Sequence, residues 1–386
     1  ARGLGKEMLV VFLLGVLIVS LLWKHYYKWQ WAKDVLVKLW FASAYVYAGQ
    51  ETKFYEIIEN RKTLPVPVME VRFRAKKELD FSNTDNTVVS DYIYKRDIFA
   101  VLGRQKITRE IPVKCTKRGR YTISDADIST NSLLYGRRYI KGLESTAEIY
   151  VYPRMTDISE IMTVCEQLLG TLQCAKRLYE DPFAFRTIRS YTTDDPMKSI
   201  NWKASAKTGS LMVNTYDSVQ SQKAMIFLDV EDRGIVKREE LIEESIAMTA
   251  TLVRKLLRQN IEVGFAYNGE GQIIMPTNRK SALTGLERML AEYDPEMGNQ
   301  DFEQMLKELF AGVFSKKPFS SDTLLIFITK NLNQQLMDCI RDCVGEYQTL
   351  VVLPVYRSER TLQNEDINSI KRKDNVQLLV KEVEGG

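Results

Sequence analysis

Residues that commonly do chemistry are few in this chain, and they are scattered. Its one histidine, His25, lies at the boundary of an apolar run near the N-terminus, so the rest of the chain has no imidazole base. None of the five cysteines has the C-x-x-C spacing of a zinc or redox site. No G-x-x-x-x-G-K-S/T phosphate loop is present either. The sequence therefore favours a binding protein over an enzyme, and it predicts no cofactor.

Two adjacent carboxylates, Asp194 and Asp195, keep a hydrolase open as an alternative. A pair of acids can act as general acid and general base on one substrate. Neighbouring residues, however, seldom face a substrate from both sides, and no nucleophile with an accompanying base is evident in the sequence. The hydrolase reading is therefore the weaker one.

The charge balance does not indicate nucleic acid as a partner. Lysine and arginine together number 54, aspartate and glutamate 50, and the net charge is only +4. So small an excess leaves no electrostatic footprint for a phosphate backbone. A basic cluster over residues 114–120 is better explained as a solvated hairpin.

The apolar run Met8–Trp23 predicts a membrane anchor. It contains no charged residue, and snorkelling by Lys6 and Lys24 can extend a run that is shorter than the ~20 residues of a full span. A cleaved signal peptide would need small residues after the run, which are absent, and a buried core helix is the remaining alternative. The basic residues after the run outnumber those before it (Lys24, Lys28, Lys33 and Lys38 against Arg2 and Lys6). The positive-inside rule then predicts a single-pass protein of the cell membrane with its body in the cytoplasm.

The remainder of the chain divides into two patterns. Residues 35–155 contain short β-branched or aromatic runs separated by turn signals, which predicts an antiparallel β-sandwich. Residues 223–386 alternate apolar strands with amphipathic helices, which predicts a doubly wound α/β sheet. Residues 156–222 form a connection with a helix near its start, and residues 1–34 form the anchor and the juxtamembrane segment. The predicted fold class is therefore multi-domain.

The connection contains the most distinctive segment, residues 189–213. Asp195 followed by Pro196 predicts a helix with the aspartate as its cap and the proline at its first position. Thr208-Gly209 then ends that helix, and residues 211–213 begin a strand.

This segment resembles the hallmark of the Domain of Unknown Function 58 family of bacterial membrane proteins. The hallmark has an arginine, a tyrosine, an aspartate, the run I-N-W-K, then a small hydroxyl residue, alanine and a basic residue. The matching positions are Arg189, Tyr191, Asp195, Ile200, Asn201, Trp202, Lys203, Ser205, Ala206, Lys207, Leu211 and Val213. The sequence departs from it at Asp194, where the family prefers glycine, and at Lys198, where it prefers arginine.

The resemblance implies an N-terminal anchor, a β-rich domain and a von Willebrand factor type A-like domain. It also implies a partner, because such proteins commonly accompany MoxR-type AAA+ ATPases and often a transglutaminase-like membrane protein. They look like non-enzymatic adaptors or assembly factors. The alternative is a peptide- or cell-wall-binding module outside the cell.

The hallmark residues have two readings. In the first they are architectural, with Trp202 in a core, Arg189 and Asp195 as a buried ion pair, and Asn201 as a cap. In the second they contact a partner, since tryptophan and arginine are enriched at interface hot spots. The candidate binding residues are Arg189, Tyr191, Asp195, Asn201, Trp202, Lys203 and Lys207.

The resemblance also bears on metal binding. Type A domains hold a divalent cation through D-x-S-x-S after their first strand, but here Asp229 is followed by Glu231 and Arg233 in place of the serines. Lys330 stands where a further acid is expected, and its ammonium is predicted to pair with Asp229 and Glu231. We therefore expect no metal site here. An alternative register would let Asp232 supply a ligand.

Overall fold

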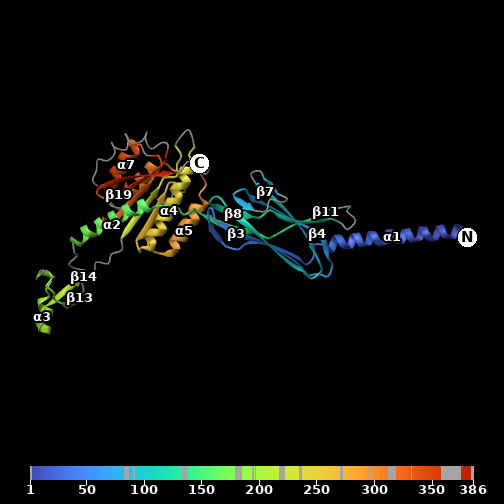
Figure 1. Cartoon of the computed structure of the whole chain (residues 1–386), viewed down its shortest axis with the longest axis horizontal. Coiled ribbons are helices and arrows are strands. Elements are labelled where there is room, and N and C mark those ends of the chain that lie inside the picture. The colour runs from blue at the N-terminus through green and yellow to red at the C-terminus, as the bar shows by residue number, and fades with distance from the viewer. Residues whose placement is uncertain are drawn as a thin grey trace. The chain divides into compact units, whose positions relative to one another are not determined.

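The computed structural model divides the chain into two units, Ala1–Arg154 and Met155–Gly386 (Figure 1). It describes residues 2–81, 87–89, 92–131, 138–178, 185–193, 195, 197–216, 222–233, 237–269, 273–295, 298–311, 319–331, 333–357 and 375–383. The predicted coarse organisation, an apolar N-terminal helix followed by a β-rich region and then an α/β region, is confirmed.

Helix α1 (Arg2–Gln30) contains the apolar run. An 18-residue window of its segment Met8–Gln30 has a mean hydropathy of 2.2 and no buried residue, so by length and composition the segment could cross a membrane. The end of the helix is different, because Tyr27 and the following Trp31 are 2% and 6% exposed and belong to the core of the first unit. The helix thus runs directly into the folded body.

The first unit is built from three sheets. One sheet has the order β1 (Val35–Phe41), β3 (Glu51–Asn60), β8 (Lys106–Cys115) and β5 (Leu79–Phe81). The second has the order β11 (Arg138–Gly142), β10 (Ala126–Asn131), β4 (Val66–Lys76), β7 (Tyr92–Val101) and β6 (Thr87–Val89). The third joins β2 (Tyr45–Tyr47), β12 (Ala147–Tyr152) and β9 (Gly119–Ile123).

The first two sheets meet in one aromatic core. Phe54 of β3 lies 5.2 Å from Phe73 of β4 and 5.7 Å from Phe81 of β5, measured between ring centroids. The pairing is antiparallel except for β2 with β12, which is parallel. The aromatic stretch of residues 40–47 is divided between two sheets, because the chain breaks after Phe41 and residues 45–47 pair with β12.

The second unit contains a six-stranded sheet in the order β17 (Ile273–Thr277), β16 (Glu262–Tyr267), β15 (Lys223–Leu228), β18 (Thr323–Ile328), β19 (Thr349–Tyr356) and β20 (Val376–Val383). All neighbours are parallel except β16 and β17. From β15 the chain adds β16 and β17 on one side of the sheet and then β18, β19 and β20 on the other side. In such a sheet a binding site usually lies at the carboxyl ends of the two strands where the order changes sides, here β15 and β18.

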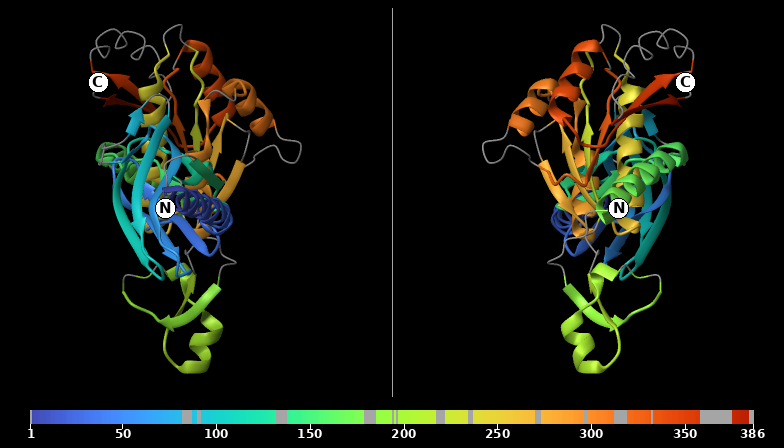
Figure 2. Two further views of the ribbon diagram at one scale, coloured as in Figure 1. Left: turned by 90° about the vertical axis from the view of Figure 1, so that its right-hand side faces the viewer. Right: turned by 90° about the vertical axis from the view of Figure 1, so that its left-hand side faces the viewer.

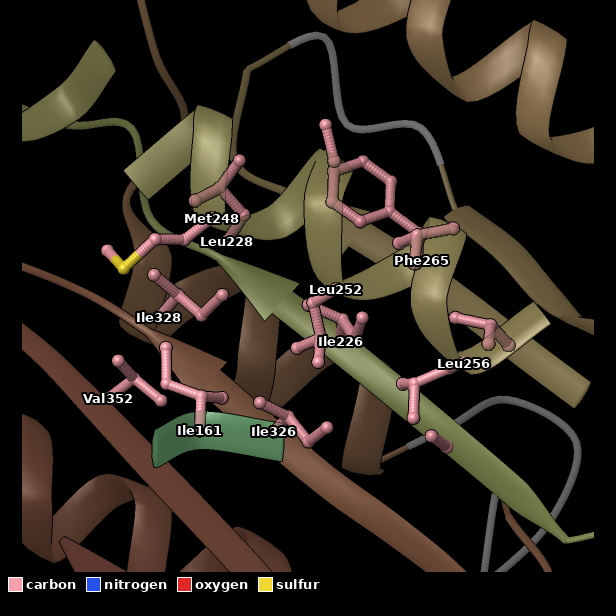
Figure 3. Close-up of a cluster of buried hydrophobic side chains, with 14 of the residues drawn as sticks. Ile161, Ile226, Leu228, Met248, Leu252, Leu256, Phe265, Ile326, Ile328 and Val352 are labelled. Carbon is pink, nitrogen blue, oxygen red and sulfur yellow. The ribbon is translucent and has the colours of Figure 1, made fainter. Parts of the chain in front are cut away.

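Helices cover both faces of this sheet because the strand side chains alternate between two cores. Ile226 and Ile326 point to the core shared with α2 (Ser159–Leu178), α4 (Glu239–Arg258) and α5 (Lys280–Glu292), as Figure 3 shows. Phe227 and Phe327, stacked at 4.6 Å, point to the core shared with α6 (Phe302–Ala311) and α7 (Gln334–Val344). The continuous apolar runs of the sequence are thus strands buried on both faces.

The hallmark residues form a small module of their own, which we call the hallmark module (the described residues of 185–216). Strands β13 (Phe185–Ser190) and β14 (Met212–Tyr216) pair antiparallel, and between them lie a 3-10 turn, η1 (Met197–Ser199), and helix α3 (Trp202–Thr208). Figure 2 shows the two strands side by side in yellow-green, with α3 at their end. An isolated bridge between Ile200 and Val213, both buried, ties η1 to β14.

Candidate functional site

The hallmark module is fixed first by an ion pair. The Arg189 guanidinium donates to both carboxylate oxygens of Asp195, at 2.6 and 2.7 Å. The backbone N–H and the hydroxyl of Thr192 donate to the same carboxylate at 2.9 and 2.8 Å. The bidentate arginine, together with these Thr192 bonds, holds the pKa of the Asp195 carboxyl well below its usual range. This carboxylate closes a loop and stays ionised.

Helix α3 begins six residues later than the sequence predicted. Its cap is Asn201, whose Oδ1 accepts from the backbone N–H of Ala204 at 2.9 Å. The expected cap, Asp195, is committed to Arg189 and Thr192, and Pro196 lies outside the described residues. The predicted end at Gly209 is confirmed, with φ of 69° in the left-handed region that glycine tolerates.

Asn201 and Ser205 join the helix to the neighbouring strand. The Asn201 amide donates to Asn214 Oδ1 at 2.8 Å. The Ser205 hydroxyl donates to the Asn201 carbonyl at 2.8 Å and accepts from the backbone N–H of Met212 at 2.8 Å. These bonds give α3, which has no buried residue, a defined position in the module.

Trp202 lies on the surface of this module. Its side chain is 66% exposed, and Met197 and Leu211 are 69% and 45% exposed. The expected alternative of a tryptophan plug in a core is therefore wrong for this residue. Three lysines are exposed in the same short stretch: Lys198, Lys203 and Lys207. Tyr191 is half-buried, and Asp194 lies outside the described residues.

The candidate residues thus fall into two sets. Asn201 caps α3, and Arg189 and Asp195 form an ion pair, as the architectural reading expects, but this pair is not buried, since the two side chains are 45% and 13% exposed. Trp202 and the lysines are presented outward, as the partner-contact reading expects. The residues that hold the module together and the residues that it exposes thus belong to one short segment of the chain.

A second candidate lies at the carboxyl ends of β15 and β18. Asp229 directly follows β15 and is 1% exposed. Its Oδ1 accepts from Asn268 Nδ2 at 2.9 Å and from the backbone N–H of Glu231 at 3.1 Å. Its Oδ2 accepts from the hydroxyl of Thr329 at 2.7 Å and from Asn331 Nδ2 at 3.0 Å. The carboxylate is therefore bound by neutral donors from the ends of three strands.

The neighbouring charges are paired differently from the expectation. Lys330, whose side chain is 4% exposed, pairs with Asp232 and not with Asp229 or Glu231. Asp232 also accepts from the backbone N–H of Arg238 at 2.7 Å. The Arg233 guanidinium instead contacts Glu231 at 2.9 Å and bridges to two acids near the start of α6, Asp301 at 3.1 Å and Glu303 at 3.2 Å.

These contacts do not fit the cation of a type A domain. A divalent ion needs several oxygen ligands with free lone pairs, whereas both oxygens of Asp229 already accept two hydrogen bonds each. Asp232, the ligand of the alternative register, is paired with an ammonium. Among the described residues, no group of three His, Cys, Asp or Glu side chains could hold a metal ion.

We therefore expect calorimetric titration of the full chain with Mg²⁺ or Mn²⁺ to give no saturable heat in the micromolar range. The physical reason is that metal binding would have to displace four hydrogen bonds inside a buried network. Saturable binding that disappears in Asp229→Ala would contradict this prediction. Buffer exchange through a chelator beforehand controls for ions carried through purification.

Sequence reasoning missed the partners of Asp229. Asn268, Thr329 and Asn331 are uncharged, and they follow the ends of two strands other than the one that Asp229 follows. The signal that could have found them is positional, because the carboxyl ends of neighbouring parallel strands meet at one edge. A polar residue directly after each apolar run was visible in the sequence.

Curated proteins and solved structures show little similarity to this chain. No curated protein matches the sequence. A non-cellulosomal cohesin from Archaeoglobus fulgidus is 14% identical, with 33% of this chain and 96% of that chain covered and a TM-score of 0.22. The CARDB domain of PF1109 from Pyrococcus furiosus is 11% identical, with 31% of this chain and 93% of that chain covered and a TM-score of 0.21. Similarities this low carry no argument.

The sequence of the second unit is more informative. Residues 187–364 match the family described as Protein of unknown function DUF58. The match includes the Arg189–Asp195 pair, the exposed Trp202 and the buried Asp229 network. Over residues 187–364 the chain therefore matches the DUF58 family.

Proposed function

We propose that this protein is a non-enzymatic, membrane-tethered adaptor or assembly factor that binds a MoxR-type AAA+ ATPase through the hallmark module. The observation that carries the proposal is the exposure of Trp202 on a module held by a bidentate ion pair, a helix cap and a strand bridge. An exposed tryptophan contributes nothing to a core. It is also among the residue types that most often anchor an interface.

The surroundings of Trp202 specify the partner surface. Met197 and Leu211 add exposed apolar area, and Lys198, Lys203 and Lys207 add positive charge. The matching surface is an apolar pocket for the indole with acidic residues at its rim, because charge complementarity speeds encounter and fixes the register of docking. A pre-ordered module also loses little conformational entropy on binding.

The other parts of the proposal follow from the anchor and the family. Helix α1 would hold the protein in the cell membrane, with the body in the cytoplasm where an ATPase is available. The doubly wound sheet would be the von Willebrand factor type A-like domain of the family. A transglutaminase-like membrane protein is a further partner, and nucleic acid is not one.

Two alternatives have less support. A hydrolase that used Asp194 and Asp195 would need one acid that releases and regains a proton, but Asp195 is bound to Arg189 and its pKa is lowered. A peptide- or cell-wall-binding module outside the cell would place the body on the opposite side of the membrane. Protease added to intact cells distinguishes the two locations, since a cytoplasmic body is protected.

Trp202→Ala tests the proposed interface. We expect the melting temperature to stay at the wild-type value, because an exposed side chain leaves no cavity. We expect the affinity for a purified MoxR-type ATPase to fall by about tenfold or more, as for a hot-spot residue. The measurement is biolayer interferometry with the full chain in nanodiscs.

The matched control is Trp40→Ala, which removes a tryptophan of similar exposure, 51%, from β1 of the other unit. It should bind as the wild type does. Equal affinity of Trp202→Ala and wild type would exclude the hallmark module as the interface. A wild-type chain that binds no such ATPase would refute the partner.

A further inference from the structure

Several features place one end of the first unit at the membrane surface. The strand register brings the start of β1, the end of β3 and the start of β8 together, with Val35 opposite Asn60 and Glu59 opposite Lys106. It also brings the start of β4 opposite the end of β7. We call this region, residues 24–35, 60–65 and 102–106 together with Glu59, the anchor end. Figure 1 shows α1 leaving the unit there.

The anchor end holds α1 rigidly. The Lys62 ammonium donates to the carbonyl of Gln30 at 2.6 Å and to that of Trp31, which satisfies the last turn of the helix. The Arg61 backbone N–H donates to the Asp34 carbonyl at 2.9 Å. With Tyr27 and Trp31 in the core, no flexible linker separates the apolar run from the sandwich.

The distances fit a contact with the headgroups. A hydrocarbon core about 30 Å thick takes up roughly 20 helical residues, so a span that begins at Met8 ends near Tyr27, and Gln30 lies only about 5 Å beyond it. The polar layer of a bilayer extends roughly 5–8 Å beyond the hydrocarbon on each side. Tyr26 and Trp29, 49% and 69% exposed, lie in this interval, where amphipathic rings are favoured. The anchor end therefore begins at headgroup level.

The turn over residues 102–105 presents an apolar tip beside basic residues. Leu102 is 65% exposed, although its backbone is fixed: Asn60 Nδ2 donates to its carbonyl at 2.9 Å and Gln105 Oε1 accepts from its N–H at 2.7 Å. Arg104 adopts a φ of 56°, a left-handed conformation that costs free energy in a residue other than glycine. A side chain on Gly103 would collide with the Thr63 carbonyl.

The anchor end as a whole carries an excess of positive charge. The cations of the anchor end are Lys24, Lys28, Lys33, Arg61, Lys62, Arg104 and Lys106, and the acids are Asp34 and Glu59. Glu59 is bound by Arg61 at 2.8 Å. Because the chain as a whole is nearly neutral, this excess is local. Clusters of this kind next to a span attract anionic lipids.

We infer that the anchor end is a second membrane contact, in which Leu102 enters the headgroup layer and the surrounding lysines and arginines bind anionic phospholipid. This inference rests on the proposed membrane anchoring. It does not depend on the hallmark module or on the ATPase.

Photo-crosslinking tests the contact. The full chain, with p-benzoylphenylalanine in place of Leu102, is inserted into nanodiscs of phosphatidylcholine mixed with phosphatidylglycerol. We expect lipid adducts in the mass spectrum. The matched control carries the same probe in place of Lys77, which is exposed in the turn after the far end of β4, about 35 Å away along that strand. It should give none.

Removing positive charge from the protein, or negative charge from the lipid, is the second part of the test. Arg104→Gln with Lys106→Gln, or nanodiscs of phosphatidylcholine alone, should lower the adduct yield at position 102 by about tenfold. Equal yields at positions 102 and 77, or equal yields in both lipids, would overturn the inference while leaving the anchor intact. Extraction of the wild-type chain from membranes by alkaline carbonate would instead overturn the anchor and this contact together.

Discussion

Replacing Asp229 by alanine is expected to lower the free energy of unfolding of the second unit by about 3–5 kcal/mol. The carboxylate is 1% exposed and accepts hydrogen bonds from Asn268, Thr329, Asn331 and the backbone of Glu231. Alanine leaves these donors buried without an acceptor. Amide hydrogen exchange of β15 and β18 under native conditions measures the loss in this unit alone.

The control for this prediction is Asp301→Ala. Asp301 also carries a negative charge near the same edge, but its side chain is 51% exposed; it contacts Arg233 and caps α6 by accepting from the backbone N–H of Gln304 at 2.9 Å. Its removal should lower the free energy of unfolding by about 1–2 kcal/mol, the cost of a helix cap and an exposed pair, which is less than the loss expected for Asp229→Ala. A loss below about 1 kcal/mol in Asp229→Ala would show that the network is not what holds the strand ends together.

Replacing Glu56 by glutamine is expected to stabilise the first unit near pH 8 and to have little effect near pH 4.5. Glu56 is completely buried between the sheets. Burial, together with the nearby Asp97 carboxylate, raises its pKa from 4.5 to about 8, against the opposing effect of Arg109 and Lys95. Glutamine has nearly the same shape and never ionises.

The sign follows from proton linkage. A carboxyl whose pKa is raised in the folded state binds its proton more tightly there than in the unfolded chain. Between pH 4.5 and about 8 the folded state therefore holds more protons, and wild-type stability falls by up to ~1.4 kcal/mol per pH unit as pH rises. Burial lowers the pKa of Lys95, whose own contribution to the pH dependence has the opposite sign.

Urea unfolding of the first unit at a series of pH values measures this slope. The variant should lose most of it, while Glu110→Gln, a change at a half-exposed carboxyl on β8 that pairs with Lys53, should keep it. Parallel curves for Glu56→Gln and wild type would contradict the raised pKa.

Much of the α/β unit could be predicted from the sequence because its elements are buried in regular patterns. Helix α4 (Glu239–Arg258) is amphipathic, as the alternation of apolar strands and amphipathic helices in this region predicted. The parallel strands were visible as apolar runs. Strand β20 was missed, since Val376–Val383 mixes charged and apolar residues and lies at the edge of the sheet.

The first unit shows why strand prediction fails where function or electrostatics intervenes. Strand β7 has its inward positions at Ile93, Lys95, Asp97, Phe99 and Val101. Two charges in the middle of this set break the alternation, so the strand was not recognised. Periodicity records which side chains are apolar, but it does not record that an ammonium and two carboxylates share a core.

Prediction of the hallmark segment from the sequence was limited in another way. Its residue types identified a family, and local chemistry predicted a helix, but two candidates for the cap stood six positions apart. Asp195 was unavailable because Arg189 holds it, a contact between positions that no helical or strand period connects. The exposure of Trp202 had no local signal at all, since it depends on the tertiary position of a short helix.

The hydrogen bonds from Lys62 to the end of α1 have a mechanical consequence. A helix that ends in a flexible linker can tilt without moving the domain attached to it. Helix α1, in contrast, moves together with the rest of the first unit. The tilt of a span responds to the thickness of the bilayer around it. In the proposed membrane-anchored state, a change in local thickness would therefore rotate the first unit through the same angle, and this unit would follow the state of the membrane instead of averaging over it.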